Sequence, residues 1–206
     1  MKKLEPFWEE FYRDDEKQAF SGKPNSTVVK YSEELRTMRR VLDMGCGEGQ
    51  NALYLAQLGV EEMEAVDVSQ AGVGKLQRRA QKMQLNVDAR VGDLTKYEFS
   101  CEYDAVMSFG TLHFVKEEEW KAFVQRAKAA TRIGGLHIMH IFTDEVPITE
   151  DLKPFAVGIA KKGALTAMYL DWEIVESTSY VFEDRHGDLP VHLHAAEKIV
   201  ARKKED

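Results

Sequence analysis

Short apolar runs alternate with segments of helical periodicity through the first two thirds of the chain. Five strands are predicted from the apolar runs at 41–42, 63–66, 86–91, 103–109 and 136–142. Between them, apolar residues recur every three or four positions, as at Val73, Leu76 and Ala80, and this spacing is typical of a helix packed on a sheet. The alternation of strand and helix predicts a parallel sheet that is covered on both faces.

The amino-terminal segment departs from this alternation. Residues 6–20 are predicted to form an amphipathic helix that docks on the domain, because four aromatic side chains fall at helical spacing on one face, namely Phe7, Trp8, Phe11 and Tyr12. The glycine and proline within 21–26 end this helix, and 27–35 is predicted to form a second one. Alternatively, the aromatic side chains are simply part of the core.

The last third of the chain also changes character. Residues 143–163 contain two prolines and little periodicity, so we predict a loop with a short helix over the edge of the sheet. A helix at 164–169 follows. Two final strands are predicted at 172–178 and 191–201, joined by a polar turn at 183–188.

Three alternate glycines lie between the first strand and the helix after it. Asp43 stands at the end of the strand, and Gly45, Gly47 and Gly49 follow before a helix that begins near Gln50. Glycine permits backbone angles that other residues avoid and lets a ligand approach the main chain, and the start of a helix presents free N–H groups. The pattern predicts a nucleotide-like ligand, with an unliganded glycine-rich turn as the alternative.

The spacing of these glycines separates two kinds of nucleotide site. A dinucleotide fingerprint requires G-x-G-x-x-G, and Gln50 occupies the position of its third glycine. The sequence therefore argues against a nicotinamide-dependent oxidoreductase, although the predicted sheet would suit one.

Length and composition describe one globular domain. The chain has 206 residues, of which 44% are hydrophobic and 31% charged, with a formal net charge of −7. That charge argues against binding to nucleic acid. No run of about 18 apolar residues is present to span a membrane, and acidic residues follow Met1-Lys2-Lys3 where a signal peptide would be apolar. We expect a cytoplasmic monomer or homodimer that binds neither nucleic acid nor membrane, with Cys46 and Cys101 as free thiols.

Acidic residues stand at the ends of the first three predicted strands, at Asp43, Asp67 and Asp93. Ligands of open parallel sheets bind beyond the carboxyl ends of the strands, and Asp67 follows the glycine turn at the interval expected for an acid that binds a ribose. Each residue alone would suit a helix cap or a solvated turn. Three of them at consecutive strand ends favour a ligand site.

An apolar strand followed by D-x-G-x-G-x-G resembles motif I of the class I S-adenosylmethionine (SAM)-dependent methyltransferases. The resemblance implies a three-layer α/β/α sandwich, Rossmann-like, with a seven-stranded, mostly parallel sheet and an antiparallel last strand. It further implies one domain over 1–206, with a helical cap at 1–38, a SAM-binding core at 39–142, and an acceptor-side loop, helix and final hairpin at 143–206. The residues expected to bind SAM are Asp43, Gly45, Cys46, Gly47, Gly49, Asn51, Asp67, Val68, Asp93, Leu94, Ser108 and Phe109.

The same resemblance implies a role for the main residues of this set. Asp67 would bind both ribose hydroxyls, and Asp93 would accept a hydrogen bond from the adenine amino group. Asp43 would orient the glycine turn and the amino group of the methionine moiety. Ser108 and Phe109 would contact the methionine moiety from the end of the fourth strand.

Longer stretches are similar to a narrower group, the tellurite-resistance methyltransferases of the TehB type. These stretches are VLDMGCGEGQNALYLAQLG from Val41, DEVP from Asp144, YLDWEIVE from Tyr169 and IVARKK from Ile199. In that family a His-Arg pair in the final hairpin is implicated in activity, and here the two residue types stand in reversed order as Arg185-His186. The acceptor is therefore left open among thiols, amines and chalcogen oxyanions such as tellurite or selenite.

Histidines gather near the end of the chain. His192 and His194 lie on the same face of an extended strand, and with Arg185 and His186 they would form a basic cluster over the pocket or a metal site. The solvated face of an edge hairpin is the alternative. No metal is expected, because no cysteine or obvious carboxylate completes the spacing.

Two further histidines follow the fourth strand. His113, in the loop beyond that strand, would point at the acceptor or serve as a structural hydrogen-bonding residue, and His140 is a candidate for the rim of the pocket. The residues predicted to be catalytic are His186, Arg185, His113 and His194.

The resemblance implies in-line transfer of the SAM methyl group to a small-molecule acceptor, which leaves S-adenosyl-homocysteine. The protein would mainly align the two reactants. His186 or His113 would act as a base for a thiol or amine, whereas Arg185 and protonated histidines would attract an oxyanion. A SAM-binding regulatory or structural module without turnover is the alternative from a different class.

Overall fold

A computed structural model of the chain describes residues 6–19, 22–185 and 190–205. These residues form seven strands, all in one sheet. The strands are β1 (Arg40–Met44), β2 (Glu62–Asp67), β3 (Val87–Val91), β4 (Tyr103–Ser108), β5 (Thr131–Phe142), β6 (Glu173–Asp184) and β7 (His192–Arg202).

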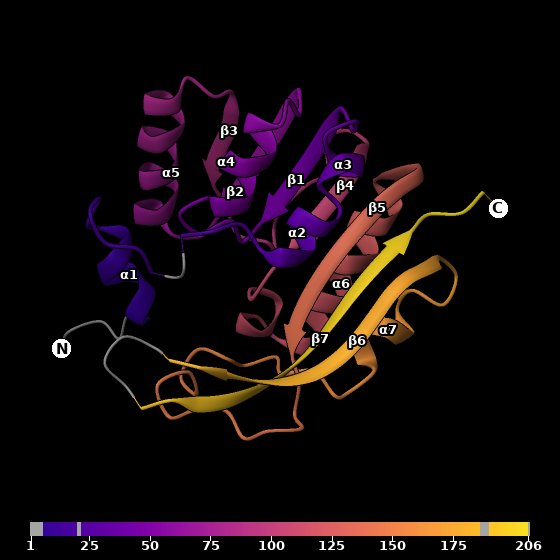
Figure 1. Cartoon of the computed structure of the whole chain (residues 1–206). Helices are drawn as coiled ribbons and strands as arrows, with labels where there is room; N and C mark the ends of the chain where they lie inside the picture. Colours follow the sequence, from indigo (N-terminus) through magenta and orange to yellow (C-terminus); the bar gives the residue numbers. More distant parts are fainter. Residues whose placement is uncertain (1–5, 20–21, 186–189, 206) are drawn as a thin grey trace.

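The strand order in the sheet is β3-β2-β1-β4-β5-β7-β6 (Figure 1). Strands β1 to β5 run parallel to one another, whereas β7 is antiparallel to both β5 and β6. The predicted fold, a mostly parallel sheet of seven strands with an antiparallel last strand, is confirmed. The order reverses between β1 and β4, which is where ligands of such sheets bind beyond the strand ends.

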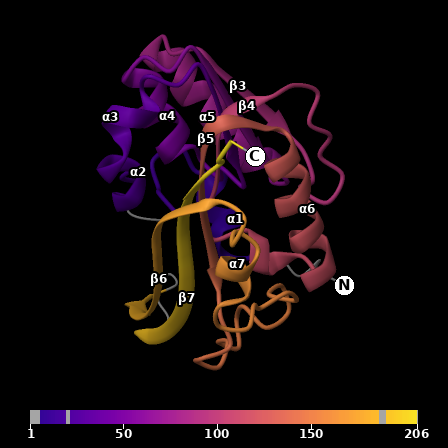
Figure 2. The same ribbon diagram turned by 90° about the vertical axis from the view of Figure 1, so that its right-hand side faces the viewer.

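Helices cover both faces of this sheet, as Figures 1 and 2 show. One face packs against α2 (Ser26–Lys30), α3 (Ser32–Leu35), α4 (Gln50–Gln57) and α5 (Gln70–Met83). The opposite face packs against the 3₁₀ helix η1 (Leu112–Phe114), α6 (Glu117–Ala129) and α7 (Ala164–Ala167). The first helix, α1 (Phe7–Tyr12), packs against α5.

Alternation of side chains along the strands supplies both hydrophobic cores. In β1, Val41 belongs to the core under α4 and α5, whereas Leu42 belongs to the core under α6. Ile138 and Met139 of β5 divide in the same way. Successive side chains of a strand point to opposite faces, so the unbroken apolar runs of the sequence fit a sheet that is buried on both sides.

The first helix is shorter than the sequence predicts. It ends at Tyr12, so the prediction of a helix over 6–20 is wrong beyond that residue. The backbone carbonyls of Phe11, Asp14 and Lys17 accept hydrogen bonds from the Lys75 ammonium. The Asp14 carboxylate also accepts a hydrogen bond from the Glu16 amide, a local bond that competes with helix.

Other elements also differ from the prediction, and β6 in particular continues to Asp184, past the end predicted at 178. The helix predicted over 27–35 is divided at Tyr31 into α2 and α3. No helix forms in 143–163, where the chain instead runs beside the end of β5 and Thr143 forms an isolated bridge with Ala160. Strand β5 begins at Thr131 rather than at Leu136, because its pairing with β4 resumes after an irregularity. Within the described residues, none of the helices has the length and apolar character required to cross a membrane.

His137 is a fully buried polar residue of β5. Its two ring nitrogens lie 2.8 Å from Thr131 Oγ1 and 2.8 Å from Tyr169 Oη. Burial, helped by the nearby Lys128 and Lys203 cations, lowers the pKa of His137 to about 3. The ring is therefore neutral at pH 7, and protonation would place an uncompensated charge in the core.

We predict that His137→Gln flattens the pH dependence of stability on the acid side. In the unfolded chain this histidine takes up a proton near pH 6.5, whereas in the folded chain it does so only near pH 3, so stability falls as pH falls between the two values. The wild-type chain should lose about 2 kcal/mol more than the variant between pH values of about 6.5 and about 5. Urea unfolding of both proteins across this range measures the difference, and equal slopes would contradict it.

Candidate functional site

The turn between β1 and α4 adopts a backbone that requires glycine. Gly45, Gly47 and Gly49 have φ angles of +78°, +54° and +84°, and residues with a side chain rarely adopt such values. The amide of Gly45 donates to the carbonyl of Val66, at 2.7 Å. The turn is thereby fastened to the end of β2, and α4 begins at Gln50 as predicted.

Neighbouring side chains approach this turn more closely than a Cβ atom would allow. A Cβ at Gly45 would lie 1.9 Å from Thr111 Oγ1, and one at Gly49 would lie 2.2 Å from Leu76 Cδ1. At Gly47 the close neighbour is Tyr12, whose Oη would be 2.4 Å away. The loop after β4, helix α5 and helix α1 therefore meet at the turn.

Asp67, the last residue of β2, links the turn to the start of α5. Its Oδ2 accepts a hydrogen bond of 2.8 Å from the Gly47 amide, and its Oδ1 accepts one of 2.8 Å from the Ser69 amide. Ser69 then caps α5 by accepting a hydrogen bond from the Gly72 amide, and serine is among the residues favoured at this position. Burial raises the pKa of Asp67, and these amide hydrogen bonds oppose the rise.

Asp43 and Ser108 carry buried polar atoms without a protein partner. Asp43 is 1% exposed and Ser108 0%, and neither Asp43 Oδ2 nor Ser108 Oγ has a hydrogen-bond partner among the described residues. Buried polar atoms in native proteins nearly always have partners. Burial first, and then the charge of Asp67, raise the pKa of Asp43 to about 7. These two strand ends therefore lack the donors that a bound molecule would supply.

The end of β3 has a mixed character. Asp93 Oδ1 accepts hydrogen bonds from the Thr95 amide and hydroxyl, at 2.9 and 2.8 Å, so part of this carboxylate serves a local turn. Val68, just beyond β2, leaves 75% of its surface exposed. An exposed branched side chain beside the strand ends offers an apolar contact for a ring.

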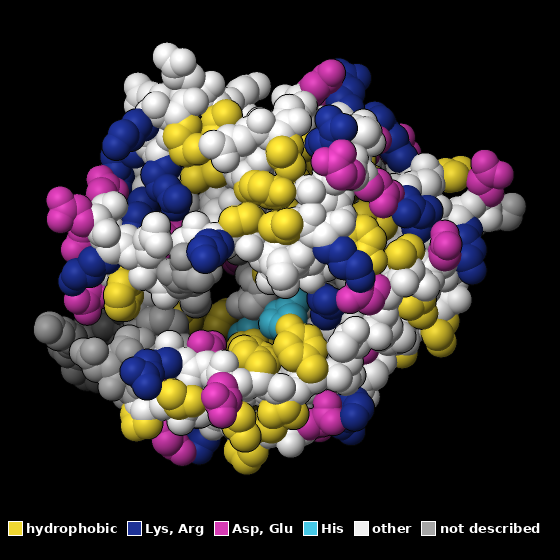
Figure 3. Space-filling model, viewed as in Figure 1, with side chains coloured by type: hydrophobic (Ala, Val, Ile, Leu, Met, Phe, Trp, Pro, Cys, Tyr) yellow, Lys and Arg dark blue, Asp and Glu magenta, His cyan; other side chains and the backbone are white. Residues whose placement is uncertain are grey.

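A hollow of about 310 Å³ opens on the face that carries α2. Its lining residues come from α2 and the residue before it, from the end of β4 and from the last three strands, and they are Asn25, Ser26, Thr27, Phe109, His140, Thr178, Tyr180 and Lys198. Figure 3 shows histidine and hydrophobic side chains gathered beside a depression near the middle of the molecule. His140, which the sequence predicted at the rim of the ligand pocket, is one of the residues that line this hollow, and its place in a ligand pocket stays a prediction.

Charge in the hollow is set by Lys198. Its ammonium lies 2.8 Å from Glu176 Oε1 and donates to Thr27 Oγ1 at 3.2 Å. Lys30 lies 2.6 Å from the other oxygen of Glu176, so one carboxylate serves two cations. Burial, followed by the Lys198 charge, lowers the pKa of His140 to about 4. At pH 7 the hollow therefore holds a cation beside a neutral imidazole.

Two of the histidines predicted to be catalytic, His113 and His194, lie in an aromatic stack. His113 stacks on Phe142 with 4.1 Å between ring centroids, and Phe142 also stacks on His194 at 4.6 Å. His192 Nε2 lies 3.1 Å from His194 Nε2, in agreement with the prediction that these two share a face. His113 is fully buried, and burial lowers its pKa well below the usual value.

A family model described as "Tellurite resistance protein TehB" matches residues 9–190. The chain belongs to the TehB family. The sequence-based resemblance to TehB-type proteins is thereby confirmed.

Individual TehB proteins and more distant relatives agree with this assignment. The "Probable S-adenosyl-L-methionine-dependent methyltransferase TehB" of Haemophilus influenzae is 28% identical over 163 residues, which are 76% of this chain and 55% of that protein. The crystal structure of TehB from Haemophilus influenzae superposes with a TM-score of 0.78 at 25% identity, over 87% of this chain and 62% of that one. This chain thus spans only about half the length of the curated relative.

A third comparison concerns the fold alone. The N-methyltransferase NodS from Bradyrhizobium japonicum, solved with S-adenosyl-L-homocysteine, is 13% identical and superposes with a TM-score of 0.70 over 96% of both chains. This match supports the three-layer class I methyltransferase fold for the TehB-family chain.

The structure brings together only part of the predicted site. Asp43, Asp67 and the glycines surround one turn, and Cys46 is buried within it, with a thiol pKa raised by burial. Asn51, which was predicted to bind SAM, contacts the residue before α2 in this structure: its Oδ1 accepts a hydrogen bond of 2.8 Å from the Asn25 amide. Of the predicted catalytic residues, His113 and His194 are not among the residues that line the hollow, Arg185 is exposed and His186 falls outside the described residues.

Sequence reasoning named Phe109 and His140 but missed the other residues that line the hollow. Thr178 and Lys198 are paired across β6 and β7, and Lys198 is paired with His140 across β7 and β5. A usable signal was the pair Glu197-Lys198 inside an apolar strand, because adjacent residues of a strand point to opposite faces. Glu197 accepts hydrogen bonds from three amides at the start of α7, including that of Thr166 at 2.8 Å, while Lys198 lines the hollow.

We predict that Gly47→Ala destabilises the fold more than Gly110→Ala. Both glycines have a left-handed backbone, with φ angles of +54° and +63°, but a Cβ at Gly110 would meet nothing within 4 Å. Gly110→Ala should cost about 1 kcal/mol of backbone strain, and Gly47→Ala about 1 to 3 kcal/mol more from the clash with Tyr12. Urea unfolding measures both free energies, and adding Tyr12→Phe should reduce the excess. Equal costs would show that Tyr12 does not lie against the turn.

Proposed function

We propose that this chain transfers the methyl group of SAM to a small-molecule acceptor. Membership of the TehB family supports the proposal, together with the name of the relative from Haemophilus influenzae. The observation that carries it is the turn itself. Three of its residues are glycines with a left-handed backbone, and the buried carboxylate of Asp43 beside it has an oxygen without a partner among the described residues.

The residues at the strand ends fit SAM in their chemistry. Asp43 Oδ2 would accept from the ammonium of the methionine moiety, and Ser108 and Phe109 would contact the same moiety. Asp67 retains lone pairs for the ribose hydroxyls beyond those used by two amides, and Val68 and Asp93 would face the adenine. When bound, SAM supplies a methyl group on a positively charged sulfur, which leaves as a neutral thioether. This chain would bind SAM and the acceptor, align the two, and exclude water from them.

The acceptor is proposed to bind in the hollow beside Phe109. Lys198 and the hydroxyls of Thr27 and Tyr180 would hold an acceptor that carries negative charge. His140 is neutral at pH 7, because its pKa is about 4, so it can accept a hydrogen bond from a thiol or an amine and orient that acceptor, but it is a weak base. The candidates remain a thiol, an amine and a chalcogen oxyanion such as tellurite or selenite.

The predicted catalytic set is retained in a modified role. His113 and His194 are proposed to shape the wall behind the hollow through their stack on Phe142. Arg185 and His186 are proposed to act from the turn between β6 and β7. On this proposal residues 1–38 cap the SAM-binding core and residues 143–206 form the acceptor side.

Methyl transfer itself is tested with SAM labelled in its methyl group. The purified chain is incubated with thiols, amines, selenite and tellurite, and labelled product is counted for each. We expect label in at least one class, and we expect His140→Ala to lower turnover while the SAM dissociation constant stays within a few-fold. SAM binding without label in any acceptor would favour a SAM-binding module, and binding of NADH in place of SAM would favour an oxidoreductase.

SAM binding is also predicted to release protons near pH 7. The pKa of Asp43 is about 7 in the absence of ligand, so close to half of the chains carry a proton there. A cationic ligand favours the charged carboxylate and lowers this pKa, so affinity should fall as pH falls below 7. Calorimetry in buffers with different ionisation enthalpies should show about half a proton released at pH 7. Asp43→Asn should abolish the release, and its persistence there would exclude Asp43 as the source.

A further inference from the structure

The glycine turn carries a buried ion pair that methyl transfer does not itself require. Glu48 lies between Gly47 and Gly49, and its Oε2 is 2.7 Å from the ammonium of Lys75 on α5. The side chains of Glu48 and Lys75 are 0% and 2% exposed. A charge pair so deeply buried needs an explanation, because the cost of removing two charges from water commonly equals or exceeds their attraction.

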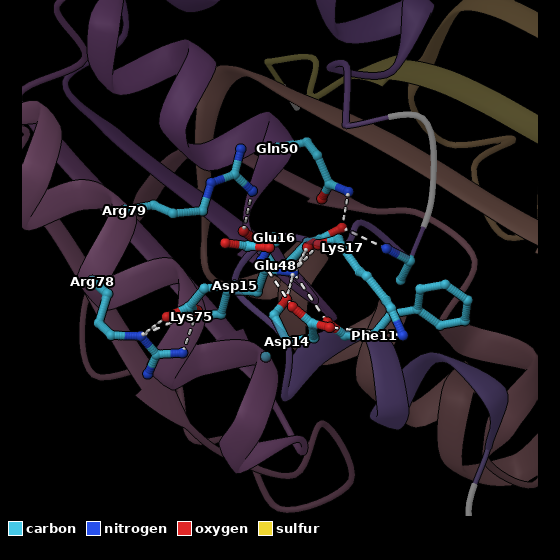
Figure 4. Close-up of polar contacts among 12 residues, drawn as sticks. Phe11, Asp14, Asp15, Glu16, Lys17, Glu48, Gln50, Lys75, Arg78 and Arg79 are labelled. Atoms are coloured by element: carbon cyan, nitrogen blue, oxygen red, sulfur yellow. Dashed lines mark hydrogen bonds and ion pairs between the residues drawn. The ribbon is translucent and has the colours of Figure 1, made fainter.

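Apart from the side-chain amide of Gln50, which donates to Glu48 Oε1 at 3.1 Å, the further partners of the pair among the described residues belong to the amino-terminal segment Phe11–Ala19, as Figure 4 shows for the residues around Lys75. Lys75 Nζ donates to the carbonyls of Phe11 at 3.1 Å, Asp14 at 2.9 Å and Lys17 at 2.5 Å. From the other side, Glu48 Oε1 accepts from the Ala19 amide at 3.0 Å. One ammonium and one carboxylate thus bind four backbone groups of a segment that is not helical beyond Tyr12.

These backbone groups explain why charge is present at the pair. A segment that leaves a helix has carbonyls without internal partners, and burying them without donors is costly. Two apolar side chains would pack here as well, but they could not bind the carbonyls. The pair therefore decides whether the segment can lie against the turn.

The seated segment covers the proposed cofactor site from one side. Tyr12 is 4% exposed and packs against Gly47 of the turn and Gly72 of α5. One turn earlier in the same helix, Trp8 packs on Phe114 beyond β4, with 4.9 Å between ring centroids. Helix α1 therefore spans from the glycine turn to the loop after β4.

We propose that Glu48 and Lys75 are positioning residues that hold Phe11–Ala19 against the glycine turn and thereby raise the affinity for SAM. The inference rests on the proposed function for its ligand, but the contact between pair and segment stands apart from it. Without the pair, Phe11–Ala19 would lie against the glycine turn for only part of the time. The apparent dissociation constant rises in inverse proportion to that fraction, so seating for a tenth of the time gives about a tenfold rise.

The decisive variant is the double substitution Glu48→Met and Lys75→Met. A single substitution would leave one buried charge unpaired and could unfold the chain, whereas two methionines of similar length keep the interior filled. Arg78→Met is the matched control, because Arg78 lies one turn further along α5 and binds Asp15 of the same segment through an exposed pair. Exposed pairs contribute little.

Three measurements separate positioning from stability. Thermal unfolding shows whether the variant is folded, hydrogen exchange without ligand reports on 11–19, and calorimetry gives the dissociation constants of SAM and S-adenosyl-homocysteine. For the double variant we expect a near wild-type melting temperature, faster exchange in 11–19, and both dissociation constants raised about tenfold. Arg78→Met should match the wild type in all three.

Two results would overturn the inference. Unchanged exchange in 11–19 would show that the pair does not hold the segment, and faster exchange with unchanged SAM affinity would show that the seated segment does not aid binding. If instead the wild-type chain bound no SAM, the proposed function would fail, and with it the link to affinity. The exchange measurement would still decide whether the pair seats the segment.

Discussion

The close contact between the glycine turn and three separate elements is the constraint on which the rest of the site depends. The main chain at Gly45, Gly47 and Gly49 is approached by Thr111, Tyr12 and Leu76, respectively, at distances that leave no room for a Cβ. The three neighbours belong to the loop after β4, to α1 and to α5. Asp67 accepts one hydrogen bond from the Gly47 amide and a second from the Ser69 amide, just before α5. A shift of the turn would therefore move the walls of the site with it.

Charge around this turn is unbalanced in a way that favours a cationic ligand. Asp43, Glu48 and Asp67 are carboxylates at or beside the turn, and within the described part of the chain Lys75 is the buried cation that offsets Glu48. Asp43 keeps a raised pKa because burial and the charge of Asp67 both disfavour its ionised form. A ligand that brings an ammonium and a sulfonium would supply the missing positive charge at low cost, since the carboxylates are already in place.

The parts of the molecule that the sequence predicts are those set by local physics. The turn from Gly45 to Gly49 and the start of α4 depend on residues within a few positions, so the sequence locates them correctly. The end of α1 at Tyr12 depends on Lys75, which lies 64 positions from Phe11 along the chain, and helical periodicity contains no such information. The position of Lys198 in the hollow was missed for the same reason. Its pairing with His140 and Thr178 depends on strand register. Register arises from packing of the whole sheet rather than from any one strand.

The two sides of the proposed site differ in how freely their residues can be exchanged. The cofactor side stands on β1, β2 and β4, whose residues fill both cores, so its side chains are fixed by packing on two faces. The proposed acceptor side includes β6, an edge strand that is largely exposed, and residues such as Thr178 can be exchanged there without disturbing either core. The segment before and within α2 contacts both sides, since Asn25 bonds to Asn51 of α4 and Thr27 bonds to Lys198. In the proposed site, the amino-terminal part of the chain therefore connects the cofactor side with the acceptor side.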